Sequence, residues 1–140
     1  MNDPDTHRTF KDEGVNPKAL GSYHLYHRID GELMAVSVLD ITPHSVSSVY
    51  LFYNPKFDFL LPGKVCAIRE IEYILKLREL GRKEMEYYMM GFYVQTCQKM
   101  RYKGEYKPSE LVCPVTYQYV KLDKRVKKLI QEKGGAVQLS

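Results

Sequence analysis

Three strand patterns follow one another between residues 21 and 53, and this run constrains the fold more than any other feature. The first covers Tyr23–Ile29, the second covers Leu33–Ile41 and the third covers Val46–Tyr53. Asp30-Gly31, between the first two, is a strong signal for a two-residue hairpin turn. Because such short links join only antiparallel neighbours, the run predicts an antiparallel meander.

A helical pattern and an apolar run follow the strands. Pro62-Gly63 precedes the helix and Gly81 follows it, as start and stop signals should. The run Tyr87–Val94 is almost wholly apolar, which predicts a strand buried on both faces and parallel to a neighbour. The residues that recur at helical spacing, with charged residues on the other faces, are Val65, Ile68, Ile71, Ile74, Leu75 and Leu77.

The order of these elements resembles the acyltransferase fold typified by GNAT enzymes: a meander, a helix led by glycine and then a buried strand. The prediction is therefore an α+β fold, with a mixed, mostly antiparallel sheet and a central helix. In folds of this kind the acyl donor lies beside the central strand and the N-terminus of the central helix. Fold alone does not fix function.

The length of the chain agrees with one domain. A chain of 140 residues, 44% of them hydrophobic, is long enough to bury a core. We expect a flexible lead-in at residues 1–20, the folded domain at residues 21–120 and a basic helical tail at residues 121–140.

Composition restricts the compartment and the chemistry. The three cysteines include no Cys-x-x-Cys pair, which argues against a disulfide framework and a zinc site. No metal is expected, and a reducing compartment is favoured. No apolar run approaches the ~18 residues of a membrane span, and the acidic N-terminus does not resemble a secretory signal. We therefore expect a cytoplasmic protein, with the nucleus as a second compartment, and no membrane association.

The most specific motifs lie between residues 87 and 117. This part of the chain reads YYxxGFY, then CxKMRYKGxYxPSEL, then CPxTY. Five other segments belong to the same pattern: Gly21–His24, Ala35–Pro43, Val46–Tyr50, Gly63-Lys64 and Ile68–Ile71. In combination they resemble the C-terminal domain of arginyl-tRNA–protein transferases, over a span from about residue 21 to residue 120.

That resemblance implies a reaction and its partners. Arginine would move from the 3′ end of its tRNA to the N-terminal amine of an acceptor protein that begins with Asp or Glu, which marks the acceptor for degradation. Arginyl-tRNA would be the acyl donor, with no other cofactor, and the enzyme is expected to be a monomer. Aminolysis of this activated ester needs no covalent enzyme intermediate, but a proton must leave the amine and oxyanion charge must be stabilised.

Two residues are candidates for catalysis. Asp40 ends an apolar strand, where it either caps a turn or, as the family pattern favours, holds or deprotonates the acceptor amine. Tyr93 either lines the cleft or lies in the core with its hydroxyl bonded. Tyr88 and Tyr93 are five residues apart, so on one regular strand they would face opposite sides.

Most candidates for binding the acceptor or the tRNA lie in a basic segment at residues 99–103. The segment fits a surface loop or short helix; as a strand it would place Lys99, Arg101 and Lys103 on one side. Cations suit an acidic N-terminus or an RNA phosphate, Arg101 suits a bidentate carboxylate contact, and Tyr102 suits stacking on a base. The alternative is a solvated charged face.

Three further binding candidates lie earlier in the chain. His24 is either part of the family motif's site or an ordinary strand residue. Gly63 and Lys64 begin the helix, where amides and the helix dipole favour a phosphate, although such residues also begin ordinary helices. Glu70 is expected on the helix surface or as a cap, with acid–base work as the alternative, and His27 has no special role.

Two other functions stay open. The first is a noncatalytic module that binds tRNA or an acidic N-terminus, because Leu61-Pro62 replaces the serine that the family usually has before the helix glycine. The second is an acetyltransferase that uses coenzyme A. It is disfavoured because residues 61–66 lack the glycine-rich Q/R-x-x-G-x-G/A pattern.

Overall fold

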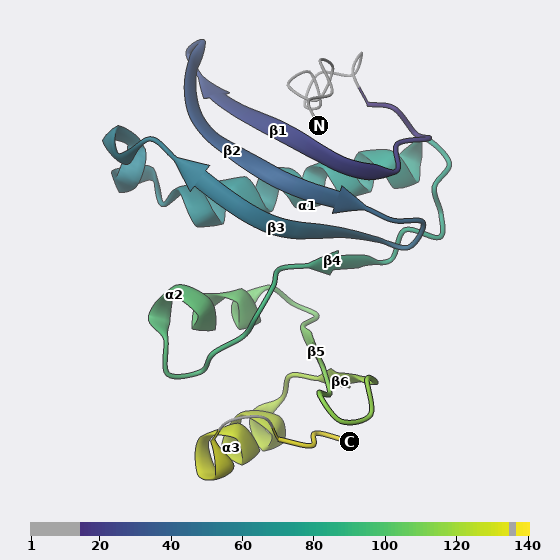
Figure 1. Ribbon diagram of the computed structural model, residues 1–140, viewed down its shortest axis with the longest axis vertical. Helices are drawn as coiled ribbons and strands as arrows, with labels where there is room; N and C mark the ends of the chain where they lie inside the picture. Colours follow the sequence, from purple (N-terminus) through teal and green to yellow (C-terminus); the bar gives the residue numbers. More distant parts are fainter. Residues whose placement is uncertain (1–14, 135–136) are drawn as a thin grey trace. The chain divides into compact units, whose positions relative to one another are not determined.

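The chain divides into two units, Met1–Gly91 and Phe92–Ser140, and the described residues of the first contain four strands and one long helix (Figure 1). The computed structural model describes residues 15–134 and 137–140. Most of the lead-in expected at residues 1–20 therefore lies outside the described residues. The expected domain limits near residues 20 and 120 stay predictions.

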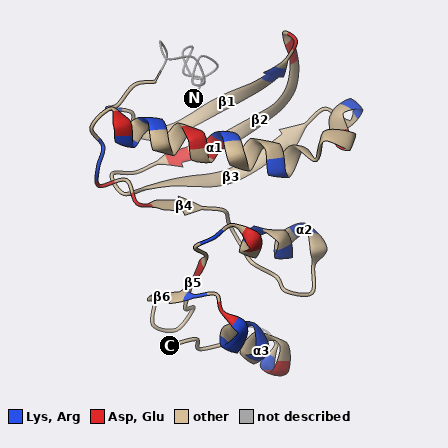
Figure 2. Cartoon of the chain, turned by 180° about the vertical axis from the view of Figure 1, so that it is seen from behind, with Lys and Arg blue, Asp and Glu red and all other residues tan. Residues whose placement is uncertain are grey.

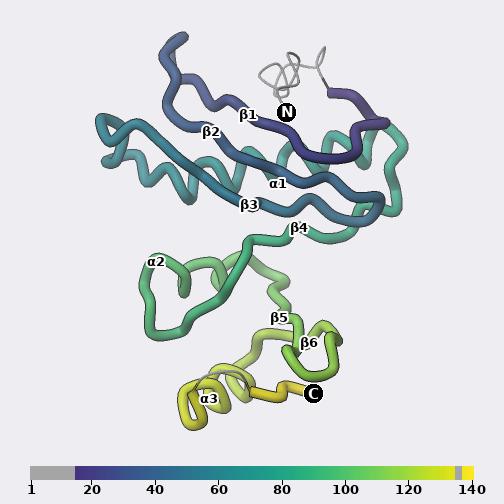
Figure 3. The backbone as a smooth tube through the Cα atoms, viewed as in Figure 1, coloured from purple at the N-terminus to yellow at the C-terminus, as the bar shows by residue number. Residues whose placement is uncertain are grey.

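The sheet of the first unit has the order β1-β2-β3-β4 (Figure 3). The strands β1 (Gly21–Ile29), β2 (Glu32–Ile41) and β3 (Ser45–Tyr53) pair antiparallel, and β4 (Tyr87–Met89) pairs parallel with β3. At the first turn, Asp30-Gly31 has φ angles of 48° and 80°, which the two-residue turn requires. The meander and the α+β class with a mixed, mostly antiparallel sheet are confirmed.

The helix α1 (Pro62–Glu79) lies against one face of this sheet, as the views from the front and from behind show (Figures 1 and 2). The helix is confirmed, and so is the burial of Ile74 and Leu77, but two other residues of the predicted apolar face are exposed. Ile68 and Leu75 are 52% and 54% exposed. Apolar residues occur all round this helix, so periodicity alone does not fix which side faces the sheet. The buried residues are Pro62, Cys66, Ala67, Glu70, Tyr73, Ile74 and Leu77.

A bulge in β3 decides which of its residues face α1. Val38 pairs with Tyr50 while Leu39 pairs with Ser48, so Val49 is an extra residue in β3. Because sides alternate along a strand, the extra residue turns Ser48 to the same side as the buried Leu39. Val49 itself is 55% exposed.

The strand predicted at Tyr87–Val94 is shorter than expected. It pairs with Ser45–Ser47 through Tyr87–Met89 alone, and these three residues are half-buried. Gly91 has a φ of 81°, a left-handed conformation that ends the extended path. Parallel pairing after a helical crossover is confirmed, but the length and the burial on both faces are wrong.

The second unit is built from two short helical segments, a two-stranded ladder and a longer helix. In α2 (Gln98–Arg101) the chain forms a helical turn that continues as a 3₁₀ turn over Tyr102–Glu105. The strands β5 (Glu110–Val112) and β6 (Tyr119–Lys121) pair antiparallel, and α3 (Lys124–Lys133) follows. A small core joins these elements; its buried members are Cys113, Leu122, Val126, Val137 and Leu139.

The helix predicted within residues 121–140 is confirmed as α3. One side of the helix is buried, because Val126 is fully buried and Leu129 and Ile130 pack against the same core. Asp123 begins the helix by accepting a hydrogen bond from the Val126 N–H at 2.9 Å.

Candidate functional site

A buried carboxylate on α1, Glu70, is the centre of a polar cluster in the first unit. Its side chain is 1% exposed. Ser48 on β3 donates a hydrogen bond to Oε1 at 3.4 Å, and the Tyr88 hydroxyl on β4 donates one to Oε2. Burial raises the pKa of Glu70, and hydrogen bonds from Ser37, Tyr88 and Ser48 oppose that rise. Burying a carboxylate without such partners is unfavourable, so the hydroxyls permit its position inside the fold.

The cluster continues from Glu70 to β1 through the fully buried Ser37. The Ser37 Oγ lies 2.8 Å from the Nε2 of His27, which is also buried. A serine hydroxyl has one hydrogen. Since Ser37 gives it to Glu70, its oxygen accepts from the Nε2–H of His27. We call the set His27, Ser37, Ser48, Glu70 and Tyr88 the Glu70 cluster.

Burial lowers the pKa of His27 to about 4, and the charge of Arg69 lowers it further. Near neutral pH the ring is therefore uncharged and has one N–H. This agrees with a donor at Nε2, and it keeps a positive charge out of the interior beside Ser37.

The candidates Asp40 and His24 lie together on the other face of the sheet. Asp40 alternates with Leu39 and Ile41, whose side chains are buried towards α1, so it faces away from the helix. It accepts a hydrogen bond from Ser22 at 2.5 Å. His24 pairs with Val38 two residues along from the Ser22–Asp40 pair, on the same face. The structure thus brings Asp40 and His24 together and separates both from the Glu70 cluster.

Gly63 and Lys64 lie in the first turn of α1, as predicted. Gly63 is half-buried and Lys64 is exposed. The Lys64 N–H donates to the Leu61 carbonyl at 2.9 Å. Leu61, the N-cap residue, has a left-handed φ of 54° and its side chain makes no capping hydrogen bond. Anion binding at this position stays a prediction.

Tyr93 belongs to the second unit and packs against its core. Its ring lies over Gly104, where an added Cβ would come within 3.1 Å of the ring. Burial and the nearby charge of Glu105 raise the pKa of Tyr93, so the hydroxyl keeps its proton. The expected placement of Tyr88 and Tyr93 on two faces of one strand is wrong, because β4 ends at Met89.

The basic segment is helical, so the strand-like alternative is wrong. Successive helical residues differ by about 100°, which places Lys99 and Lys103 on one side and Arg101 on another. Lys99 and Arg101 are exposed. Lys103 is half-buried and donates to the carbonyl of Phe92 at 3.2 Å, and burial lowers its pKa.

Tyr102 follows α2 in the 3₁₀ turn. Its ring meets the ring of Tyr106 edge-on, with 6.4 Å between the centroids. Such a pair holds both rings in defined orientations. Stacking of a base on Tyr102 stays a prediction.

The Glu70 cluster is not among the predicted site residues, although two signals for it exist in the sequence. Glu70 lies four residues after Cys66 and four before Ile74, on the buried stripe of the helix. Ser37 interrupts the apolar strand at residues 33–41. A carboxylate and a hydroxyl at two core positions predict a buried pair, provided that the buried side of the helix is known.

Comparison with known proteins identifies the family of the chain. Residues 1–113 match the family model described as "Arginine-tRNA-protein transferase, C terminus". Arginyl-tRNA--protein transferase 1 of Dictyostelium discoideum is 45% identical over 113 residues, or 81% of this chain and 18% of the relative. The Arabidopsis thaliana protein of the same name is 48% identical over 109 residues, or 78% of this chain and 17% of the relative.

The chain belongs to this arginine-tRNA-protein transferase family and matches its C-terminal part. The resemblance inferred from the motifs is therefore confirmed. A more distant relative, an aspartate/glutamate leucyltransferase of Campylobacter jejuni, is 32% identical over 90 residues, 64% of this chain and 35% of the relative. The chain spans less than a fifth of the length of the two first relatives.

Proposed function

We propose that this chain is the acyl-transferring part of an arginyl-tRNA–protein transferase. It moves arginine from the 3′ end of arginyl-tRNA to the N-terminal amine of a protein that begins with Asp or Glu, and so marks the acceptor for degradation. The observation that carries the proposal is the family match, because residues 1–113 include both the sheet with α1 and the basic turn at residues 99–103.

The reaction is the aminolysis of an ester. The amine nitrogen bonds to the acyl carbon, the ester C–O bond breaks, the amine loses a proton and the terminal hydroxyl of the tRNA leaves with one. In the first unit, Asp40 has a carboxylate on the face of the sheet away from α1, where it suits holding or deprotonating the amine. In the second, Tyr93 keeps its proton and so suits hydrogen bonding to an oxyanion.

Seven residues have binding roles in this proposal. The exposed cations Lys99 and Arg101 suit the carboxylate of an acidic N-terminal residue. His24, Gly63, Lys64, Tyr102 and Lys103 are assigned to the acceptor or the tRNA.

A GNAT-like fold supports the proposed chemistry. The order of meander, helix and parallel strand agrees with it, and so does the short ladder, since β3 runs on to Tyr53 after β4 has ended. In such a fold the acyl donor lies where these strands part. Glu70 is then a positioning residue, because it holds the Tyr88 hydroxyl in the ladder, one residue before the ladder ends.

In this proposal the protein is a monomer that acts in the cytoplasm and the nucleus, and it needs no cofactor besides arginyl-tRNA. No helix in residues 15–134 and 137–140 is long and apolar enough to cross a membrane.

The test is a transfer assay with the full chain, tRNA charged with labelled arginine and a peptide that begins with Asp. Label should appear on this peptide and not on the same peptide with an acetylated N-terminus, because acetylation removes the nucleophilic amine. Absence of transfer to the free peptide contradicts the proposal.

A noncatalytic binding module is the second candidate. The observation that favours it is the altered start of α1, where the N-cap residue Leu61 has an apolar side chain that makes no capping hydrogen bond. Binding of tRNA by the chain, without transfer at any peptide concentration, supports this function in place of the first.

A further inference from the structure

The positive charge of the chain is concentrated in its second unit. Residues 92–140 contain ten Lys or Arg and four Asp or Glu, which gives a net charge of +6. Residues 1–91 contain eleven Lys or Arg and thirteen Asp or Glu, which gives a net charge of −2. Figure 2 shows the basic residues gathered along α3. A surface with this much positive charge attracts a polyanion over a distance set by the ionic strength.

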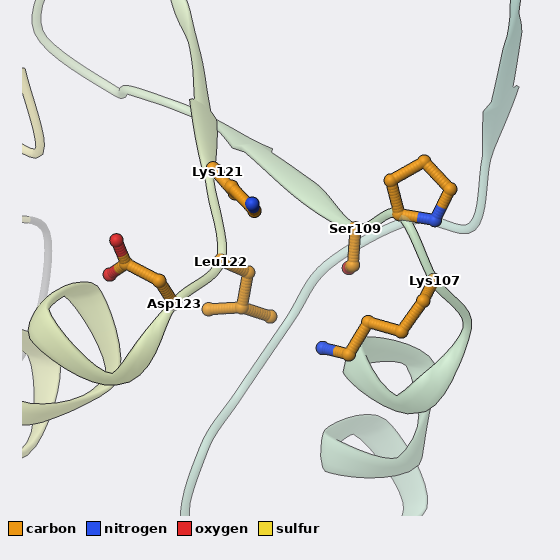
Figure 4. Close-up of a pocket in the computed structure, with 6 residues that line it drawn as sticks. Lys107, Ser109, Lys121, Leu122 and Asp123 are labelled. Atoms are coloured by element: carbon orange, nitrogen blue, oxygen red, sulfur yellow. The ribbon is translucent and has the colours of Figure 1, made fainter.

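A pocket with a volume of about 470 Å³ lies beside β6 in this unit. In the view of Figure 4, the side chains of Lys107, Ser109 and Lys121 extend towards the space between them, and the carboxylate of Asp123 points the other way. The Leu122 N–H donates to the Ser109 carbonyl at 2.8 Å, which joins the two sides of the pocket. The lining residues are Lys107, Pro108, Ser109, Lys121, Leu122 and Asp123.

The two lysines of the pocket are positioned by the fold. The Lys107 Nζ donates to the Gly104 carbonyl at 2.7 Å, and an ammonium group has two further N–H donors to offer. Lys121 follows Val120, which packs against the core, so alternation along β6 directs Lys121 away from that core. Two ammonium groups and a serine hydroxyl suit a phosphate, which accepts several hydrogen bonds.

The carboxylate at the pocket, Asp123, already has a structural use. It accepts the hydrogen bond from the Val126 N–H that begins α3. That bond lowers the pKa of Asp123, and the positive charges of Arg125 and Lys121 lower it further. The carboxylate is therefore charged but surrounded by cations, and the neighbourhood remains positive.

The packing of α3 favours RNA over a lipid surface as the partner. A helix that binds a bilayer needs a free apolar face beside its basic one. In α3 the apolar residues Val126, Leu129 and Ile130 pack against the core of the unit. The residues left exposed include Lys124, Arg125, Lys128 and Lys133. The exposed side of α3 is therefore basic and has no apolar face beside it, as expected for a helix that contacts phosphates.

We propose that the pocket at Lys107 and Lys121, together with the exposed basic residues of α3, binds the phosphates of an RNA backbone. The family match ends at residue 113, so Lys121 and α3 lie outside the matched part of the chain. The inference rests on the proposed function only in that tRNA is the expected RNA. It adds a backbone contact surface to the basic turn at residues 99–103.

The test measures binding of uncharged tRNA to the full chain as the salt concentration rises. The variant Lys107→Ala/Lys121→Ala should bind more weakly at low salt. The slope of log K against log salt should fall by about one for each phosphate contact that is lost. A matched control, Lys18→Ala/Lys83→Ala, removes two exposed lysines of the first unit and should keep the original slope. The variant Lys107→Arg/Lys121→Arg should retain most of the binding, because the charges remain.

Three results would overturn the inference: the pocket variant and the control give equal slopes, the full chain does not bind tRNA, or vesicles of anionic lipid bind the chain and the pocket variant loses only that binding. Inorganic phosphate should compete with tRNA more weakly than added RNA, since it occupies one subsite; equal competition per phosphate means a site for free phosphate. If the chain transfers arginine but the pocket variant and the control give equal slopes, only this inference is wrong. If the pocket variant has a smaller slope but the chain transfers no arginine, only the proposed function is wrong.

Discussion

The hydroxyl of Tyr88 on β4 donates a hydrogen bond to the carboxylate of Glu70 on α1, so that a side chain of the edge strand is bonded inside the fold. The strand β4 has a ladder of only three residue pairs with β3. A contact between its middle residue and a buried carboxylate therefore contributes to holding β4 in place. The same contact also gives the buried Oε2 of Glu70 a hydrogen-bond donor, and a buried acceptor without one would be unfavourable.

Replacing Glu70 with alanine should destabilise the first unit. The hydroxyls of Ser37, Ser48 and Tyr88 would lose their shared acceptor, and an unsatisfied buried donor costs about 1–3 kcal/mol. The free energy of unfolding, measured by urea denaturation, should fall by at least that amount. Glu72→Ala, at an exposed position on the same helix, should change it by no more than about 0.5 kcal/mol. Similar losses in both variants would mean that the cluster has no special weight.

The stability of the first unit should depend on pH through His27. Its pKa is about 4 in the fold, against an ordinary value of 6.5, so the unfolded chain binds a proton more readily between these values. Stability should therefore fall as the pH drops from about 6.5 to about 4, by up to about 3 kcal/mol. Glu70 acts in the opposite direction, because a carboxyl with a raised pKa loses its stabilising contribution as the pH rises.

The variant His27→Gln separates the two effects. Stability curves of the wild type and the variant, recorded across that pH range, should differ most steeply between pH 4 and 6.5. Parallel curves across this range would show that His27 is not the group that titrates.

An alanine at Gly104 should destabilise the second unit. Its Cβ would lie 2.7 Å from Cδ2 of Leu122 and 3.1 Å from Cε2 of Tyr93, so both side chains must shift. Such overpacking typically costs about 1–3 kcal/mol. In the double variant Gly104→Ala/Leu122→Ala the smaller neighbour makes room, and the loss should be less than the sum of the single losses. Strict additivity would show that Gly104 and Leu122 do not crowd each other.

The variant Arg101→Ala should lower transfer to a peptide that begins with Asp and leave the fold intact. Loss of a hydrogen bond to a charged group, worth about 1.5–3 kcal/mol, corresponds to a drop in kcat/KM of about 10- to 100-fold. Because the side chain is exposed, thermal melting should hardly change. Lys83→Ala is the control for the loss of one positive charge. A sharp drop in melting temperature with normal activity per folded molecule would make Arg101 structural.

The elements of the first unit were predictable because local signals specify them. The hairpin at Asp30-Gly31 needs left-handed φ angles that such a pair readily adopts, and the helix has Pro62-Gly63 at its start. The length of the last strand was not predictable from its apolar run. Hydrophobic character favours burial, but pairing also requires a neighbouring edge, and the left-handed Gly91 ends the extended path after Met89.

The position of a candidate site residue was predictable only where its motif lies on the surface of the protein. Lys99 and Arg101 are exposed, as the basic segment implied. The sequence predicts Glu70 on the surface, because carboxylates are rarely buried, and only tertiary contacts with β2, β3 and β4 reverse that expectation. Arg82 is a similar case. It is buried, and it donates to the carbonyls of Ala19 and Thr42, 63 and 40 residues away in the chain, which no local pattern specifies.

The additional residue at position 49 limits how the chain can vary in length. A substitution there changes an exposed side chain and leaves its neighbours as they are. A deletion would instead rotate the preceding part of β3 by half a turn, which would take Val46 out of the interior and point Ser48 away from Glu70. Spacing, rather than residue identity, is therefore what natural variation must preserve at this position.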